Sequence, residues 1–93
     1  MDHARIDYVP RRRGREAMLR LTIPRGQDIA FIFLPFSALK MVDPRVILDD
    51  EASMRATFHE QVFNLNSRLT KRVARLTAGQ VLLVTAAMLW KAR

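Results

Sequence analysis

The sequence predicts an α+β domain in which a small antiparallel sheet, made of a hairpin and a C-terminal strand, packs against one long amphipathic helix with short flanking helices. Three observations indicate this fold. Residues 17–34 hold two apolar segments separated by a turn, residues 49–76 carry apolar side chains at helical spacing, and a short branched apolar segment follows residue 79. With 93 residues, of which 49% are hydrophobic, the chain suits one small domain with its own core.

The N-terminal residues 1–16 are polar and rich in arginine, and we interpret them as a basic, mobile arm or a loosely docked edge segment. The single α+β domain then spans residues 17–93. Chain ends with few large apolar side chains are usually poorly tied down. Four arginines of this segment surround Gly14, namely Arg11, Arg12, Arg13 and Arg15. They either keep the protein in solution or contact an anionic surface, such as the phosphates of nucleic acid or a membrane.

Residues 17–34 predict a β-hairpin. Leu19, Leu21 and Ile23 alternate with polar side chains, which is typical of a half-buried strand. Residues 24–28 combine proline, glycine and aspartate, and this composition predicts a turn. Residues 29–34 are apolar on both faces, so we expect the second strand to be central or covered.

The next residues, 36–42, predict a short helix after Pro35. The Asp43-Pro44 pair ends it, because the residue before a proline is disfavoured in helical conformation. A short apolar connection at residues 46–48 then leads to the long helix.

Residues 49–76 predict one long amphipathic helix. Asp49, Asp50 and Glu51 stand at its start, where acidic side chains cap backbone amides and complement the helix dipole. Gly79 follows its end, where a left-handed cap residue is common. The apolar stripe consists of Met54, Phe58, Val62, Leu65, Leu69, Val73 and Leu76. With the hairpin, we expect a core containing Leu19, Leu21, Ile23, Phe31, Phe33, Phe58, Val62, Leu65 and Leu69.

The C-terminal residues 80–91 leave two structures open. The branched segment at residues 81–84 favours a third strand, followed by a short helix that Thr85 caps. The alternative is one continuous helix over residues 78–91.

The charge of the chain is strongly positive and unevenly spread. The net charge is +7, which favours an acidic partner such as nucleic acid, an anionic membrane surface or an acidic protein. A second basic cluster, besides the N-terminal one, lies at the end of the long helix and comprises Arg68, Lys71, Arg72 and Arg75. These cations either complement the helix dipole in solvent or form a surface for an anionic ligand.

Phe63 falls outside the apolar stripe of the long helix. A second packing contact is the simplest explanation for it. That contact is either with another element of the same fold or with another subunit.

Several chemistries lack the residues that they need. The chain has no cysteine, which excludes disulfides and favours an intracellular, cytoplasmic location. The apolar segment at residues 81–90 is too short to span a bilayer, and the N-terminus lacks the apolar segment of a signal peptide. The two histidines have no metal-binding spacing, no serine stands in a nucleophile elbow, and the three glycines are isolated. We therefore expect no enzyme activity, no metal site and no cofactor.

Several short segments resemble one known bacterial family. They are Tyr8 with the arginines that follow it, Leu21-Thr22-Ile23-Pro24, Gly26, Ala38-Leu39, Phe58-His59, Val73-Ala74-Arg75 and Val81-Leu82-Leu83-Val84-Thr85. In this order they are similar to the small proteins grouped as domain of unknown function 1488, over about residues 6–90. The resemblance implies a compact α+β domain and supplies no activity or binding residues. Ala86 and Ala87 depart from it, because an acidic residue is expected after Thr85.

The sequence thus favours a non-enzymatic binding module with a basic surface. In the leading hypothesis, both basic clusters contact nucleic-acid phosphates without reading the bases. The alternative is a protein-interaction or structural module. It self-associates, as a homodimer through an open sheet edge or the Phe63 side, or it binds an acidic protein.

Overall fold

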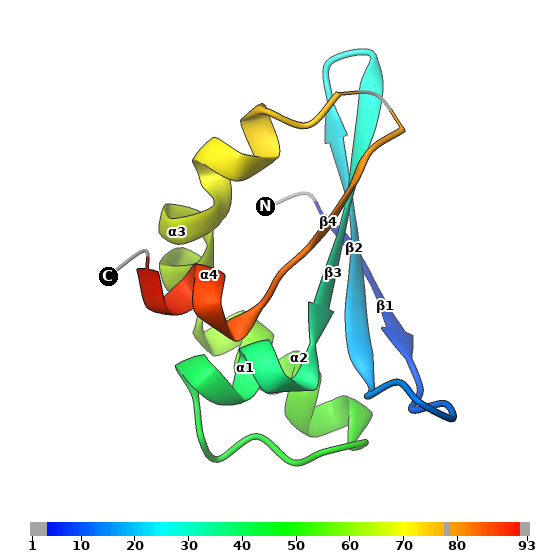
Figure 1. Cartoon of the computed structure of the whole chain (residues 1–93), viewed down its shortest axis with the longest axis vertical. Helices are drawn as coiled ribbons and strands as arrows, with labels where there is room; N and C mark the ends of the chain where they lie inside the picture. Colours follow the sequence, from blue (N-terminus) through cyan, green and yellow to red (C-terminus); the bar gives the residue numbers. More distant parts are fainter. Residues whose placement is uncertain (1–3, 78, 92–93) are drawn as a thin grey trace.

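The computed structural model describes residues 4–77 and 79–91, and it has two layers (Figure 1). One layer is a four-stranded sheet with the strand order β1-β2-β3-β4. The strands are β1 (Arg5–Val9), β2 (Met18–Arg25), β3 (Asp28–Pro35) and β4 (Val81–Leu83). The other layer consists of α1 (Phe36–Val42), α2 (Glu51–Glu60), α3 (Val62–Ala74) and α4 (Ala86–Lys91). All four helices lie on one side of the sheet. The α+β fold class is therefore confirmed.

The predicted hairpin is present as β2 and β3, which pair antiparallel over their whole length. Gly26 supplies the positive φ of 61° that a tight hairpin turn requires. The turn is also clamped by an ion pair, with 2.8 Å between Arg25 Nε and Asp28 Oδ1. The predicted short helix is α1, with the expected bounds.

The pairing of β2 with β3 decides which side chains enter the core. Leu21 lies opposite Ile32, and Leu19 opposite Leu34, and all four are buried against the helices. We call this side of the sheet the inner face. Since successive side chains of a strand point to opposite faces, the residues between them form the outer face.

The expected core was wrong for β3. Phe31 and Phe33 lie on the outer face and are half-buried, while Ala30, Ile32 and Leu34 are buried on the inner face instead. A strand that is apolar at every position has no alternation that determines which of its faces is buried. The pairing with β2 determines it instead. Of the other expected core residues, Ile23 and Val62 pack only partly against the core, and the rest are buried: Leu19, Leu21, Phe58, Leu65 and Leu69.

The predicted long helix is two helices, and this is a second correction. Gln61 leaves the helical conformation, with φ −103° and ψ 8°, and separates α2 from α3. A straight helix over residues 49–76 would be roughly 40 Å long, whereas the longest extent of the domain is 35 Å. The bend keeps both halves of the stripe on the core, because Met54, Phe58, Leu65 and Leu69 are all buried.

The ends of the predicted helix also differ. Asp49 lies outside α2 with a positive φ of 62°. Asp50 is the cap, since the backbone N–H of Ser53 donates to Asp50 Oδ1 over 3.1 Å. At the other end α3 stops at Ala74. Gly79, with φ 82°, therefore shapes the turn before β4 instead of capping the helix.

The C-terminal segment forms a strand and a short helix, as the first of the two alternatives predicts. The backbone N–H of Met88 donates to Thr85 Oγ1 over 3.2 Å, so Thr85 caps α4. The direction of β4 is a third correction, because it pairs parallel with β3. The chain leaves β3 at the lower end of the sheet and climbs through α3, so β4 must descend beside β3 (Figure 1).

The N-terminal segment contributes the edge strand β1, in line with the docked-edge alternative. Residues 5–9 pair with residues 22–18 of β2. No helix in the described part of the chain is long and apolar enough to cross a membrane.

Two leucines of the sheet test the assignment of faces. Leu21 is 1% exposed on the inner face and Leu83 is 51% exposed on the outer face. Leu21→Ala should lower the free energy of unfolding by about 2–5 kcal/mol, because it leaves a cavity. Leu83→Ala should cost about 1 kcal/mol or less, because half of that side chain is already in water. Urea unfolding of both variants measures the difference, and equal losses would contradict the assignment.

Candidate functional site

The eight basic residues of the sequence hypothesis lie in two separate places. Arg11, Arg12, Arg13 and Arg15 are in the connection between β1 and β2, which we call the arginine loop. Arg68, Lys71, Arg72 and Arg75 are in or directly after α3, and we call them the α3 cluster.

The strand β2 separates the two groups. It begins beside the arginine loop at Met18 and ends at Arg25, whose Nη1 donates to the carbonyl oxygen of Val73 near the end of α3 over 2.6 Å. An eight-residue strand is about 25 Å long. The arginine loop and the end of α3 are therefore at opposite ends of the domain (Figure 1), and the eight residues do not form one surface.

The α3 cluster divides further by its contacts. Arg68 is half-buried, and its Nη1 donates to the carbonyl oxygen of Leu89 over 3.0 Å, which ties α4 to α3. Lys71, Arg72 and Arg75 are exposed at the C-terminal end of α3. That position gives cations a favourable interaction with the helix dipole. The structure thus gives Arg68 a packing contact and leaves three cations facing solvent.

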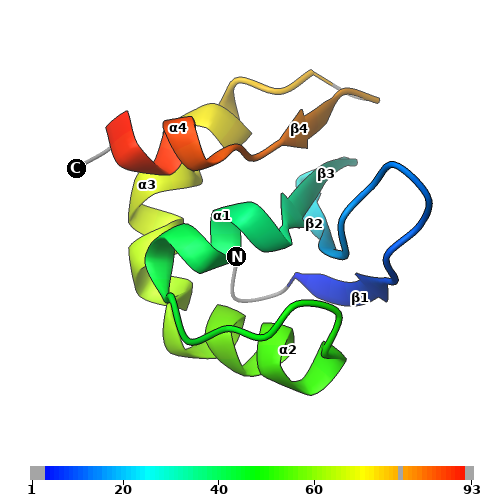
Figure 2. The same cartoon turned by 60° about the horizontal axis from the view of Figure 1, so that its bottom comes forward.

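The arginine loop is held in a defined shape. The backbone N–H of Arg15 donates to the carbonyl oxygen of Arg12 over 2.8 Å, and the reverse bond is 3.2 Å. Gly14 takes a φ of 77° in the turn between them. The backbone N–H of Arg11 donates to Asp49 Oδ1 over 3.3 Å. Figure 2 shows the loop projecting beyond the sheet on the side away from the helices.

The arginine loop forms the rim of an open groove with a volume of about 1250 Å³. All four of its arginine side chains are exposed, and none takes part in the ion pairs found among the described residues. The floor is apolar and aromatic, and it comprises Met18, Phe33, Pro35, Phe36, Leu48 and Leu83.

Two carboxylates also line this groove, and both already accept a hydrogen bond. Glu16 Oε1 accepts from Ser37 Oγ over 2.6 Å. Asp49 Oδ1 accepts from Tyr8 Oη over 2.6 Å. Four guanidinium groups against two carboxylates leave the lining with an excess of two positive charges. The groove therefore combines a cationic rim with an apolar floor.

The floor of the groove continues onto the outer face of the sheet, which none of the described helices covers. Val81 and Leu83 of β4 pair with Phe31 and Phe33 of β3, and each is about half exposed, at 50% and 51%. Sequence reasoning missed this face because it assigned both phenylalanines to the core. The available signal was that residues 29–34 are apolar on both faces, whereas the predicted helices could cover only one face of the sheet.

Asp49 anchors the arginine loop to the helical layer. Its positive φ of 62° is a conformation that non-glycine residues seldom adopt. The hydrogen bond from Tyr8, with burial and the Asp49 charge adding to it, raises the pKa of Tyr8 to about 12. The same hydrogen bond, followed by the one from the backbone of Arg11, lowers the pKa of Asp49. Tyr8, Asp49 and the loop therefore behave as one unit.

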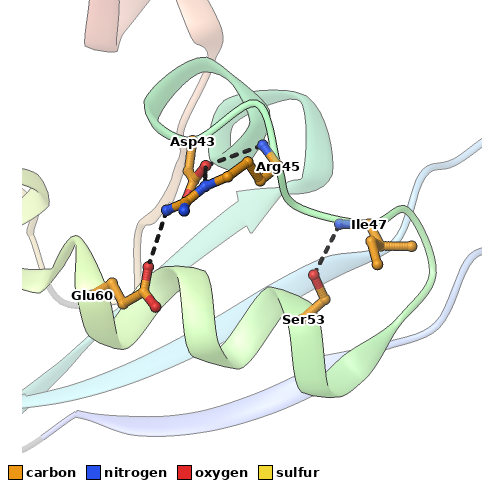
Figure 3. Close-up of polar contacts among 5 residues, drawn as sticks. All are labelled: Asp43, Arg45, Ile47, Ser53 and Glu60. Atoms are coloured by element: carbon orange, nitrogen blue, oxygen red, sulfur yellow. Dashed lines mark hydrogen bonds and ion pairs between the residues drawn. The ribbon is translucent and has the colours of Figure 1, made fainter.

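A second polar cluster closes the connection between α1 and α2 (Figure 3). Asp43 accepts hydrogen bonds from the backbone and side chain of Arg45, with Nε 3.0 Å from Oδ1. These bonds lower the pKa of Asp43. The guanidinium also lies 3.7 Å from Glu60 of α2, and the backbone N–H of Ile47 donates to Ser53 Oγ. Every charged group in this cluster is paired, so it serves to hold α1 against α2.

The sequence predicts a second packing contact for Phe63. The structure shows no such contact with another element of the described fold, because Phe63 is 84% exposed. In residues 4–77 and 79–91, no three His, Cys, Asp or Glu side chains gather closely enough to hold a metal ion.

Comparison with known proteins does not identify the groove. No family model, no curated protein and no solved structure matches this chain.

The Tyr8–Asp49 hydrogen bond predicts a specific dependence of stability on pH. A raised tyrosine pKa stabilises the fold fully below the ordinary value of 10.0, and this contribution is lost as the pH rises toward 12. The depressed pKa of Asp49 contributes above the ordinary value of 3.8 and is lost as the pH falls below it. The stability difference between wild type and Tyr8→Phe should be constant between these limits and shrink beyond them.

The phenolate absorbance gives a direct readout, because Tyr8 is the single tyrosine of the chain. Asp49→Asn is the matched control, since asparagine tolerates a positive φ but carries no charge. It should move the pKa of Tyr8 back toward 10.0. An unchanged titration in Asp49→Asn would contradict the proposed cause.

Proposed function

We propose that this protein is a non-enzymatic, cytoplasmic module that binds nucleic acid through its phosphates at the arginine loop. The observation that carries the proposal is the position of Arg11, Arg12, Arg13 and Arg15. They stand exposed, on an anchored turn, along the rim of an open groove with excess positive charge. The net charge of +7 adds long-range attraction for a polyanion.

The chemistry of arginine suits this ligand. The planar guanidinium group donates two parallel hydrogen bonds to a phosphate, which a lysine ammonium does not match. Holding the loop in advance lowers the entropy lost on binding, and the bonds between Arg12 and Arg15 with the contact to Asp49 hold it. The proposal is narrower than the sequence hypothesis, since the α3 cluster lies about one strand length away and is left outside the site.

Paired charge-removing variants test the proposal. Arg12→Gln with Arg13→Gln should weaken binding to an oligonucleotide, because two phosphate contacts are lost. The slope of log K against log salt should become less steep by about 1.4 for a single strand or 1.8 for a duplex. Fluorescence anisotropy over a series of salt concentrations measures both quantities.

The matched control is Lys71→Gln with Arg72→Gln, which removes the same charge from the α3 cluster. It should weaken binding much less and leave most of the salt slope. Equal effects of the two double variants would assign the binding to net charge alone. No binding at low salt would overturn the proposal.

A second candidate function, protein interaction, rests on Phe63. Phe63 is 84% exposed, and exposing apolar surface to water is unfavourable. Aromatic side chains are enriched at protein interfaces. Its partner is a second copy of the chain or an acidic protein, the latter because the net charge of the chain is +7.

The mass in solution tests self-association at this residue. Phe63→Glu should shift the protein toward the monomer, because it places a charge in the proposed contact. Ser67→Glu, one helical turn away and also exposed, is the control and should shift the mass less. An unchanged monomer in wild type and both variants rules against a homodimer through Phe63, and sedimentation velocity distinguishes these cases.

A further inference from the structure

We infer that the nucleic acid held in this groove is a single strand, with a base stacked on Phe33 and the strand continuing toward Phe31. This inference rests on the proposed function, and it names the class of nucleic acid and the residues that contact its bases.

The position of Phe33 relative to the arginine loop is the first argument. Phe33 lies on β3 in the floor of the groove, and the arginine loop forms the rim of the same groove. A nucleotide whose phosphate meets the rim can therefore place its base on the floor. Every base has an aromatic face, so stacking on a phenylalanine needs no particular sequence.

The spacing of the aromatic side chains also favours a single strand. Phe31 and Phe33 are two residues apart on one strand, so they share the outer face. Their backbone positions are about 7 Å apart. Beyond Phe33, toward the start of β3, the same face therefore presents a second aromatic side chain, that of Phe31. Four-stranded sheets that bind single-stranded RNA present aromatic side chains on an open face in a similar way.

A duplex does not use this floor. In a duplex the bases stack on one another, and only their edges and the phosphates are exposed. The arginine loop could still contact its backbone, but Met18, Phe33 and Leu83 would stay in water. A single strand exposes its bases and can cover these side chains. The apolar floor therefore discriminates between the two.

Charge argues against a second copy of this chain as the occupant of the groove. On the strands of the outer face, Asp7 is the single acid. It already lies 3.2 Å from Arg20 and 3.5 Å from Arg5. A second copy packed across the groove would bring the same lining, in which four arginines outnumber Glu16 and Asp49 by two charges, so the arginines of the two copies could not all be paired. Guanidinium groups left unpaired in an interface oppose association, whereas phosphates pair with them.

Three labelled probes test the inference by fluorescence anisotropy. They are a short oligothymidine, an abasic strand of the same length, and a duplex of the same length. Wild type should bind the oligothymidine more tightly than the other two. Phe33→Leu should weaken oligothymidine binding by roughly tenfold, because it removes one stacking surface. It should leave abasic-strand binding and the salt slope unchanged, because phosphate contacts are intact.

Two further variants separate stacking from folding. Phe33→Trp should restore the affinity, since it returns an aromatic face at the same position. Ile47→Ala removes an exposed apolar side chain that does not line the groove and should change no affinity. Unfolding curves of the variants confirm that they are folded.

The outcomes distinguish this inference from the proposed function. If duplex and single strand bind equally, and Phe33→Leu changes neither while the Arg12 and Arg13 variant weakens both, the phosphate-binding function stands and the single-strand inference is overturned. If no probe binds at low salt, both are overturned. If wild type dimerises and Leu83→Arg makes it monomeric without changing oligothymidine binding, a second copy occupies this face and the inference is overturned.

Discussion

The antiparallel pairing of β2 with β3 is the constraint on which the rest of this structure depends. It sets Leu21 opposite Ile32 and Leu19 opposite Leu34, so these four side chains form the inner face, against which the helices pack. The same register turns Phe31 and Phe33 to the other side. A shift by one residue would reverse both faces. The register of this pairing therefore determines both the core and the open aromatic face.

Much of the fold could be predicted from local patterns. The alternation in β2, the turn at Gly26, the helix after Pro35 and the cap at Thr85 each depend on neighbouring residues alone, and each is present in the structure. The apolar stripe of the long helix was predicted correctly in part: Met54, Phe58, Leu65 and Leu69 are buried, whereas Val62, Val73 and Leu76 are half-buried. Periodicity reports which side chains will be buried, and it does so even where the backbone bends.

The features that could not be predicted depend on contacts between distant residues. The face of β3 depends on its partner strand, because its own sequence is apolar on both faces. The break at Gln61 reflects the size of the domain and is not marked by glycine or proline. The sequence shows two basic clusters but not how far apart they lie, and only the length of β2 shows that they are at opposite ends of the domain. The groove combines residues from the first sixteen positions with Leu48, Asp49 and Leu83, and no local pattern joins these.

Because the described helices lie on one face, the other face of the sheet is open and is apolar along β3 and β4. The edges of the sheet are β1 and β4. Such edges are templates for pairing between chains, and the charge of +7 opposes this by repulsion between copies. A polyanion neutralises that repulsion. Under the proposed function, copies gathered on one long nucleic acid would therefore meet with their edges and open faces less strongly held apart. The proposed function then implies that crowding along a shared scaffold, rather than concentration in bulk solvent, favours pairing of these edges.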